Sequence, residues 1–231
     1  PHRIREEGGV GKRGPPPPPR PTLTYAAFLA DPVRHLAPLR RDPVKLLQVL
    51  YNAVQVALSA YMAIGAFVMA RRAGYGIICN EFDPSERGVS SIVWLFFVSK
   101  AVDFTDTVFM VVRRKWRQLS FLHWYHHASV FATYWWVAAC AYTGDLWVPI
   151  LGNCVVHTLM YAYYLSTCFG IAPPWGQRLT EMQMVQFVLM ATHGCVMLAR
   201  GCPYPPRVSA FYVTYIVAML ALFANFYVRK H

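Results

Sequence analysis

Charged residues are scarce in this chain, and acidic residues are the scarcest of them. Only 14% of the 231 residues are charged, with 11 acidic side chains against 22 basic ones, while 56% are hydrophobic. This composition is too apolar for an ordinary soluble domain and predicts a membrane protein with several spans. The net charge of +11 does not indicate nucleic acid as a partner, because the chain lacks a basic helix with base-reading or base-stacking side chains. We expect anionic lipid headgroups and phosphorylated carriers to balance that charge.

The first 45 residues lack an apolar stretch long enough to cross a bilayer, which takes roughly 20 residues. Residues 1–22 carry charge, glycine and a run of five prolines, which predicts a disordered or polyproline arm and not a signal peptide. We divide the chain into this N-terminal arm, 1–45, and a transmembrane domain, 46–231. The chain begins with Pro1 instead of Met, as expected of a fragment or an incomplete gene product.

Long hydrophobic runs fill the rest of the chain and predict an all-α fold. Inside a bilayer every backbone polar group has to be satisfied within the protein, so runs of this length are helices and not strands. Loops with Gly, Pro and charge separate the runs, as at 71–88 and 200–208. The six predicted transmembrane helices cover about 46–70, 89–112, 119–143, 146–169, 178–199 and 209–228.

Basic residues that flank these spans are shared unevenly between the two sides of the membrane. The side of the N-terminal arm carries ten, namely Arg40, Arg41, Lys45, Arg113, Arg114, Lys115, Arg117, Arg178, Arg229 and Lys230. The opposite side carries five, namely Arg71, Arg72, Arg87, Arg200 and Arg207. By the positive-inside rule, the richer side faces the cytosol, together with the loop 113–118 and the C-terminus.

The 6 cysteines lack the C-x-x-C spacing of redox and zinc sites. Those inside spans are read as small apolar fillers. Only Cys79 and Cys202 lie in loops, and the predicted topology puts both loops on the non-cytosolic face. A disulfide between them can form if that compartment is oxidising, but two loop cysteines also reach one face by chance, so the pairing stays open.

Ionisable side chains inside a span are costly to bury, so each one indicates a functional site. The second span carries four polar residues at steps of three and four, hence on one helical face: Lys100, Asp103, Asp106 and Thr107. A structural salt bridge between Lys100 and Asp103 would account for two of them. It leaves the second aspartate unexplained, which favours a functional role for the group.

The third span begins with His123, His126 and His127, whose rings are expected on one side of the helix near its cytosolic end. An H-x-x-H-H box also occurs in membrane di-iron desaturases, but those enzymes need several such boxes, and one box cannot ligate two irons. A single zinc ion with His157 or an aspartate as a further ligand remains an alternative. We assign no metal.

The fourth and fifth spans each carry a further polar stripe at helical spacing. The fourth has Asn153, His157, Tyr161 and Tyr164. The fifth has Thr180, Gln183 and Gln186. Hydrogen bonding between helices is enough to explain the amides and tyrosines. Four consecutive spans with polar stripes nevertheless predict one polar chamber, enclosed by helices and open toward the cytosol.

These stripes form four ordered motifs, through which residues 46–229 resemble the ELO family of very-long-chain fatty acid elongases. The motifs are K-x-x-D-x-x-D-T from Lys100, H-x-x-H-H from His123, N-x-x-x-H-x-x-M-Y-x-Y-Y from Asn153 and T-x-x-Q-x-x-Q from Thr180. The resemblance implies a multi-pass enzyme of the endoplasmic reticulum that condenses acyl-CoA with malonyl-CoA. Family members have seven transmembrane helices, so the first is absent here, or residues 23–30 are its remnant.

The resemblance extends to substrate preference. Asp103 and the stretch before His123 look most like the polyunsaturated-chain elongases of algae and other lower eukaryotes. Trp124 inside the histidine box is instead similar to elongases of saturated and monounsaturated chains. Chain length and unsaturation therefore stay open, with polyunsaturated acyl-CoA as our expectation.

The resemblance also implies catalytic roles. Condensation needs a nucleophile for the acyl group and donors for the enolate oxygen, and a neutral imidazole can be the nucleophile. By position in the family motif, His126 accepts the acyl group as an acyl-imidazole, and His157 faces it across the chamber. We assign His123 and His127 to orientation and proton transfer. Asn153 is assigned to a hydrogen bond at the thioester or enolate oxygen.

The other motif residues are assigned to the substrate. Lys100 and the basic loop suit the CoA phosphates, although membrane topology alone would also explain that loop. The two aspartates would position Lys100 or a histidine. The substrate-binding set is Lys100, Asp103, Asp106, Thr107, Arg113, Arg114, Lys115, Tyr161, Tyr164, Gln183 and Gln186.

The expected partners follow from the same resemblance. Acyl-CoA and malonyl-CoA are the substrates, no cofactor is added, and membrane lipid surrounds the protein. The ketoacyl-CoA reductase, the dehydratase and the enoyl reductase of the elongation cycle are expected to associate with it, and the oligomeric state is open, including a homo-oligomer. Two alternatives of other classes are a metal-dependent membrane desaturase or hydroxylase and a proton-coupled transporter that uses the same side chains as a relay.

Overall fold

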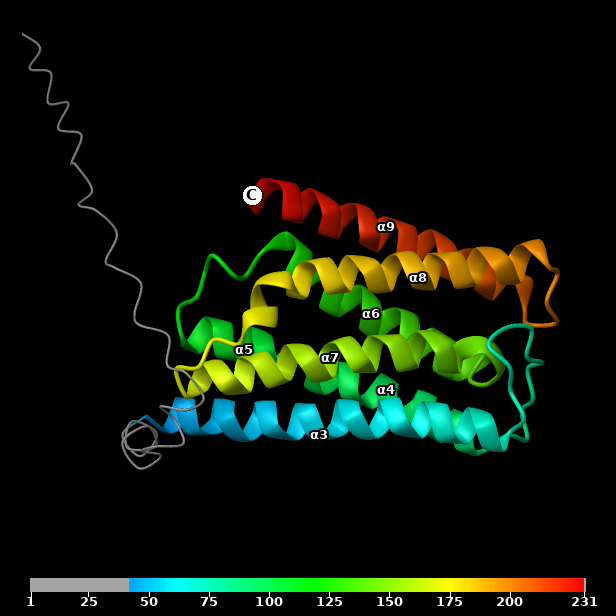
Figure 1. Cartoon of the computed structure of the whole chain (residues 1–231), viewed down its shortest axis with the longest axis horizontal. Coiled ribbons are helices and arrows are strands. Elements are labelled where there is room, and N and C mark those ends of the chain that lie inside the picture. Colours follow the sequence, from blue (N-terminus) through cyan, green and yellow to red (C-terminus); the bar gives the residue numbers. More distant parts are fainter. Residues whose placement is uncertain (1–41, 231) are drawn as a thin grey trace, which may run out of the picture.

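The computed structural model describes residues 42–230, and this range contains seven α-helices and two short 3-10 helices (Figure 1). Residues 1–41 of the predicted arm, 1–45, lie outside the described residues together with the apolar remnant at 23–30, whereas Pro43, Val44 and Lys45 belong to the first turn of a helix. The α-helices are α3 (Pro43–Arg72), α4 (Gly88–Val102), α5 (Phe104–Val112), α6 (Phe121–Cys140), α7 (Trp147–Cys168), α8 (Leu179–Ala199) and α9 (Pro206–Lys230). The 3-10 helices are η1 (Gly144–Leu146) and η2 (Pro174–Arg178).

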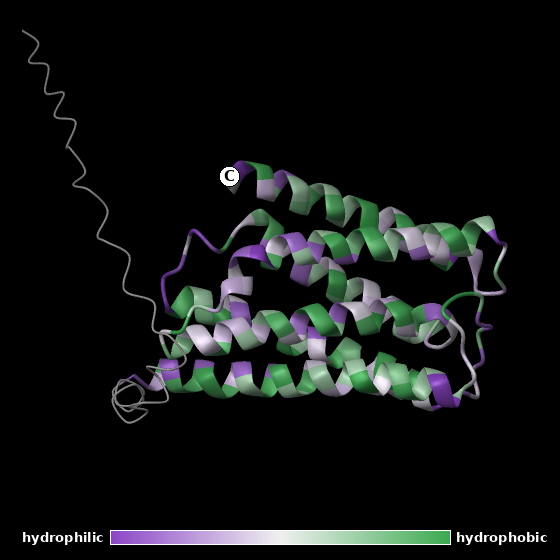
Figure 2. Ribbon diagram, in the orientation of Figure 1, coloured by the Kyte–Doolittle hydropathy of each residue, from purple (hydrophilic) through white to green (hydrophobic). Residues whose placement is uncertain are grey.

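The long helices form a bundle in which α4 and α5 together make one row and the other α-helices make one row each (Figure 1). Hydrophobic residues run along the helices, and hydrophilic residues gather mainly near their ends and in the loops (Figure 2). The predicted all-α, polytopic membrane fold is thereby confirmed. Within the described range, four segments are long and apolar enough to span a membrane: Pro43–Arg72, Gly144–Cys168, Pro174–Ala199 and Pro206–Arg229.

The chain alternates between the two ends of the bundle, but of the six predicted spans those at 89–112 and 119–143 are not among the four segments long and apolar enough to cross a membrane. The start of α3, the loop 113–120, the segment 169–178 and the C-terminus of α9 lie at one end, which we call the site end (Figure 1). The loops 73–87 and 200–205 lie at the opposite end, which we call the far end (Figure 1). The histidine box at the start of α6 therefore shares its end with the basic loop.

The second predicted span, 89–112, is not one uninterrupted helix. It consists of α4 and α5, which meet at Asp103. The amide of Asp103 still donates to the Ser99 carbonyl at 2.9 Å, but the amide of Asp106 donates to the Asp103 carbonyl at 3.1 Å, only three residues back. The helix is thus locally tighter at Asp103, whose buried carboxylate is bound by other helices. The hydrophobicity of the sequence alone does not reveal such a break.

Helix α3 packs one face into the bundle and contacts α7 over much of its length. Small residues on that face allow a close approach, among them Ala63, Ala66 and Ala70 near the far end. Van der Waals contact and hydrogen bonds, more than hydrophobic burial, hold helices together in lipid. The site-end half of the same face is polar, with Asn52, Gln55 and Ser59 buried.

A disulfide closes the far end of the bundle. Cys79 in the loop 73–87 is bonded to Cys202 in the loop 200–205, with their Cα atoms 4.6 Å apart. The bond joins positions 123 residues apart in the sequence and ties the start of the bundle to the α8–α9 hairpin. The structure thus decides in favour of the pairing that the sequence left open.

Candidate active site

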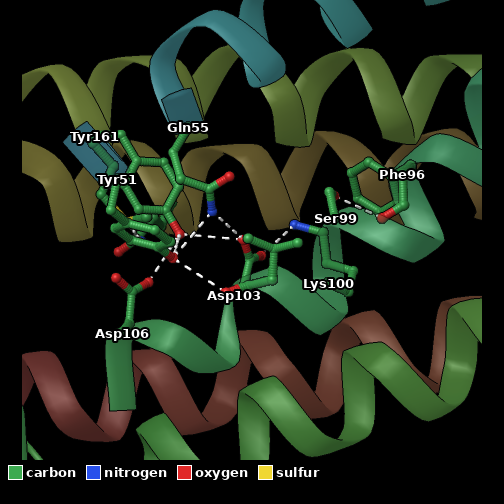
Figure 3. Close-up of polar contacts among 11 residues, drawn as sticks. Tyr51, Gln55, Phe96, Ser99, Lys100, Asp103, Asp106 and Tyr161 are labelled. Atoms are coloured by element: carbon green, nitrogen blue, oxygen red, sulfur yellow. Dashed lines mark hydrogen bonds and ion pairs between the residues drawn. The ribbon is translucent and has the colours of Figure 1, made fainter. Parts of the chain in front are cut away.

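Lys100, near the end of α4, and Asp103, at the break between α4 and α5, form an ion pair inside the bundle. The ammonium nitrogen of Lys100 is 2.8 Å from Oδ2 of Asp103, and the two residues are only 5% and 3% exposed (Figure 3). The same nitrogen lies 4.5 Å from the centre of the Phe96 ring, which adds a cation–π contact. The salt bridge considered from the sequence is therefore present, and its ammonium group is buried away from the loops.

The carboxylate of Asp103 also has hydrogen-bond partners other than Lys100. Its other oxygen, Oδ1, accepts a hydrogen bond from Nε2 of Gln55 at 2.6 Å and lies 3.2 Å from the hydroxyl of Tyr161 (Figure 3). Donors from α3, α4 and α7 thus converge on one carboxylate. A buried charge is tolerated only when such partners satisfy it, so the three helices are fixed relative to one another at this point.

The second aspartate shares a partner with the first. The hydroxyl of Tyr161 donates to Oδ2 of Asp106 at 2.8 Å, while Tyr51 lies 3.5 Å from that hydroxyl and accepts a bond from Gln55 at 3.1 Å (Figure 3). A phenol carries one proton, so Tyr161 serves one carboxylate at a time. Asp103 and Asp106 are therefore coupled through a single hydroxyl group.

The three histidines of α6 lie together, as their spacing predicted. The ring centres of His123 and His127 are 4.3 Å apart, and those of His126 and His127 are 5.5 Å apart. Ser120 begins the helix by accepting a hydrogen bond from the amide of His123 at 3.2 Å. Nε2 of His123 also lies 2.9 Å from the hydroxyl of Thr107, which ties α6 to α5.

His157 belongs to the same neighbourhood. It is 8% exposed, and its ring centre lies 5.8 Å from that of Tyr161. In the described part of the chain, neither His126 nor His157 has a hydrogen-bond partner at a ring nitrogen. Oδ1 of Asn153, one turn away from His157, is likewise buried without a partner among residues 42–230. Three polar groups assigned to catalysis are thus left available inside the bundle.

Some predicted substrate residues lie apart from this cluster. Tyr164 is 38% exposed, and its ring centre lies 6.0 Å from that of Tyr161. The amide nitrogen of Gln183 is 3.8 Å from the sulfur of Met160, and that of Gln186 is 3.1 Å from the sulfur of Met190 in its own helix. These glutamines make helix contacts of the structural kind that the sequence also allowed.

In the basic loop 113–118, one arginine is bonded to other side chains of the protein and the remaining basic residues are exposed. Arg113 pairs with Oδ2 of Asp42 at 2.7 Å and donates to Gln48 at 3.2 Å, which anchors the end of α5 to the start of α3. The guanidinium of Arg113 holds the pKa of Asp42 below its usual value. Arg114 and Lys115 are exposed at the site end.

Two cavities lie away from the histidine box. One, of about 30 Å³, lies near the far end between α6, α7, α8 and α9. The other is an open groove of about 430 Å³ between α8 and α9, lined by small and apolar residues such as Ala191 and Leu220.

The geometry also bears on the metal alternative. Within residues 42–230, no three His, Cys, Asp or Glu side chains are grouped so that they could hold one metal ion. The box histidines instead contact a hydroxyl and aromatic rings: Thr107 at His123, Phe223 at His126 and Phe104 at His127.

Two residues of the site were missed in the sequence. Tyr51 and Gln55 on α3 complete the network around the aspartates, and both lie in the first span, where no motif was recognised. Their spacing could have indicated them, because Tyr51, Gln55 and Ser59 recur every four residues within an apolar run. Polar residues at such spacing inside a span were the signal used for the other spans.

Fold and site together define the class: an all-α, polytopic membrane protein with a buried histidine and carboxylate cluster at one end of its bundle. The chain belongs to the GNS1/SUR4 family, abbreviated ELO, whose sequence profile matches residues 18–231. The family resemblance inferred from the four motifs is thereby confirmed.

Several curated proteins are similar to the chain. Very long chain fatty acid elongase 2 of Mus musculus is 35% identical over 188 residues, which cover 79% of this chain and 64% of that protein. Very long chain fatty acid elongase 4 of Homo sapiens is 34% identical over 208 residues, or 83% of this chain and 64% of that protein. Fatty acid elongase 6 of Leishmania major is 32% identical over 203 residues, or 80% and 52%. The chain thus spans less than two thirds of the length of these relatives.

Proposed function

We propose that this protein is a fatty acid elongase, which condenses a long-chain acyl-CoA with malonyl-CoA to give 3-ketoacyl-CoA, CoA and CO2. Membership of the ELO family and the names of the similar elongases support the reaction class. The observation that carries the mechanism is the histidine box, in which the ring centre of His127 lies 4.3 Å from that of His123 and 5.5 Å from that of His126.

In the first half-reaction, an unprotonated ring nitrogen of His126 attacks the thioester carbonyl carbon. A C–N bond forms and the C–S bond breaks, so CoA leaves with the electron pair of that bond. The leaving sulfur takes up one proton, which the ring loses when it becomes a neutral acyl-imidazole. We assign the transfer of this proton to His127, whose ring centre lies 5.5 Å from that of His126.

In the second half-reaction, malonyl-CoA loses CO2, and the electron pair of the broken C–C bond forms an enolate. The enolate carbon attacks the acyl carbon on His126, which forms the new C–C bond and breaks the C–N bond. The ring regains its electron pair and takes up one proton. Asn153 is close to His157 on α7 and is the polar group that we assign to the enolate oxygen.

The carboxylate network is assigned to positioning. Lys100 is paired with Asp103 inside the bundle, so we no longer assign its ammonium group to CoA phosphates. Together with Gln55 and Tyr161, the pair holds α3, α4 and α7 around His157, whose ring contacts Tyr161. The CoA phosphates are assigned to the exposed loop residues Arg114 and Lys115, with Arg117 beside them.

The finer substrate proposal is a polyunsaturated acyl chain. The acyl tail would leave His126 between the helices toward the far end, where the apolar and aromatic lining limits its length. The protein is proposed to reside in the endoplasmic reticulum membrane, with the site end in the cytosol. There it would hand its ketoacyl product to the reductase, dehydratase and enoyl reductase of the cycle.

The test is a product assay with purified protein. Acyl-CoA and isotope-labelled malonyl-CoA should give labelled 3-ketoacyl-CoA and CO2, with turnover unaffected by metal chelators. A panel of saturated and polyunsaturated acyl-CoAs in the same assay decides the chain preference. Loss of turnover on chelation with recovery on adding iron or zinc would support the metal alternative. Proton flux into liposomes without a ketoacyl product would support the transporter alternative.

A further inference from the structure

The hydroxyl group of Thr107 on α5 contacts the histidine box directly. Its oxygen lies 2.9 Å from Nε2 of His123, and within residues 42–230 it has no other hydrogen-bond partner. The sequence assigned Thr107 to substrate binding, but this contact is made to a residue of the box. The direction of the hydrogen bond decides which ring nitrogen of His123 carries the proton.

The hydroxyl of Thr107 is not used within its own helix. A helical threonine can donate its hydroxyl hydrogen to the carbonyl four residues earlier, as the exposed Thr192 of α8 does to Val188 at 2.9 Å. For Thr107 that carbonyl belongs to Asp103, at the break between α4 and α5, where it accepts from the amide of Asp106 at 3.1 Å. The Thr107 hydroxyl bonds to His123 instead, so its hydrogen is available to the imidazole.

The two groups have complementary hydrogen-bonding capacity. A hydroxyl carries one hydrogen, and a neutral imidazole donates from one nitrogen and accepts at the other. If Nε2 of His123 carried the ring proton, it would donate to Thr107, and the hydroxyl hydrogen would have no acceptor among residues 42–230. We propose that Thr107 is a positioning residue that donates to Nε2 of His123 and so fixes this ring as the tautomer with its proton on Nδ1. The catalytic purpose of this tautomer rests on the proposed condensation, whereas the hydrogen bond itself does not.

Both partners of this bond are held in place by neighbouring contacts. On α5, Asp106 directly precedes Thr107 and accepts a hydrogen bond from Tyr161 of α7 at 2.8 Å (Figure 3). On α6, the amide of His123 donates to the hydroxyl of Ser120 at 3.2 Å, which fixes the backbone at the start of the helix. The short helix α5 therefore links the carboxylate network to the histidine box through two adjacent residues.

A fixed tautomer would serve the proton transfers that we assign to the box. The ring centre of His127 lies 4.3 Å from that of His123 and 5.5 Å from that of His126. With Nε2 bonded to Thr107, the neutral His123 ring has Nδ1–H as its remaining polar group, so it can only donate there. Loss of the Thr107 hydroxyl should allow the ring to turn and to exchange tautomers. The reaction should then slow without weaker substrate binding.

The first experiment measures the tautomer by nitrogen NMR. The full chain, isotope-labelled at its histidine nitrogens, is placed in lipid nanodiscs at alkaline pH, and the His123→Asn variant identifies the His123 signals. We expect an unprotonated Nε2 and a protonated Nδ1 in the wild-type chain and in Thr107→Ser, and a changed tautomer population in Thr107→Val. Thr105→Val is the matched control and should keep the wild-type tautomer, since Thr105 lies about 200° around α5 from Thr107. A proton on Nε2 in the wild-type chain would overturn the proposal even if no variant folds, and so would an unchanged tautomer in Thr107→Val.

The second experiment measures condensation and separates this inference from the proposed function. Thr107→Val should lower kcat by about 10–100-fold, a part of the ~10²–10⁴-fold that a positioned acid–base group contributes, and leave KM for acyl-CoA unchanged. Thr107→Ser should restore most of the loss, because it keeps the hydroxyl. Wild-type kcat in Thr107→Val would overturn the positioning role. Absence of a ketoacyl product from the wild-type chain would overturn the proposed function and the catalytic purpose with it, but not the tautomer measured by NMR.

Discussion

Gln55 on α3 donates a 2.6 Å hydrogen bond to the same Asp103 carboxylate that Lys100 neutralises on α4. Gln55 and Asp103 are 48 positions apart in the sequence, and Gln55 and Lys100 each supply a donor to a different oxygen of that carboxylate. A helix outside the four motifs therefore contributes directly to the arrangement of the motif residues. The predictions below follow from this network and from the two ends of the bundle.

Removing the Gln55 donor is expected to weaken both stability and activity. Gln55→Leu leaves Oδ1 of Asp103 with Tyr161 alone, and a lost hydrogen bond to a buried charge destabilises a protein by about 1.5–3 kcal/mol. The unfolding free energy in detergent and the rate of ketoacyl formation should both fall. Val54→Ala is the matched control, since Val54 is 59% exposed on the same helix, and it should be nearly neutral. Wild-type values for Gln55→Leu would contradict the positioning role.

Breaking the buried ion pair should cost more than removing both of its members. Lys100→Met strands the Asp103 carboxylate, a change that typically destabilises by about 3–5 kcal/mol. Adding Asp103→Leu to that variant removes the stranded charge, so the double variant should be less destabilised than the sum of the two single ones. A double-mutant cycle on unfolding free energies measures the coupling. Additive losses would mean that the two charges are not paired in the membrane.

The tie between Arg113 and Asp42 predicts a pH-dependent contribution at the site end. The bond to Arg113 lowers the pKa of Asp42, so its stabilising effect is present above the ordinary aspartate pKa of about 3.9 and is lost as the pH falls through the lower folded value. Arg113→Gln should therefore lower the unfolding temperature at pH 7 and leave it unchanged at strongly acidic pH. A difference that persists undiminished at low pH would assign the effect to another contact of Arg113.

Much of the fold and part of the site were predictable from the sequence. Span positions follow from the lengths of apolar runs, and the shared face of His123, His126 and His127 follows from helical spacing, since both depend only on local geometry. The break at Asp103 and the role of Gln55 were not predicted. Both depend on which distant side chains meet a buried carboxylate, and a single sequence read without partners does not contain that information.

The far-end disulfide predicts sensitivity to reduction. Cys79 and Cys202 close a loop of 123 residues, and a disulfide across a long loop typically stabilises by about 2–4 kcal/mol. Cys79→Ser should lower the unfolding temperature under oxidising conditions and have no effect once a reductant is present. Non-reducing electrophoresis gives an independent readout, in which the wild-type chain should migrate faster than Cys79→Ser. Equal mobility would argue against the bond.

The central claim is that a ring nitrogen of His126 takes the acyl group from its carrier. The most direct measurement is mass spectrometry of the purified chain, quenched rapidly after incubation with acyl-CoA alone. We predict free CoA in solution and one acyl group on the peptide that contains His126, both absent in His126→Ala and both retained in Thr192→Val. An acyl group on another residue, or undiminished acylation of His126→Ala, would contradict the account.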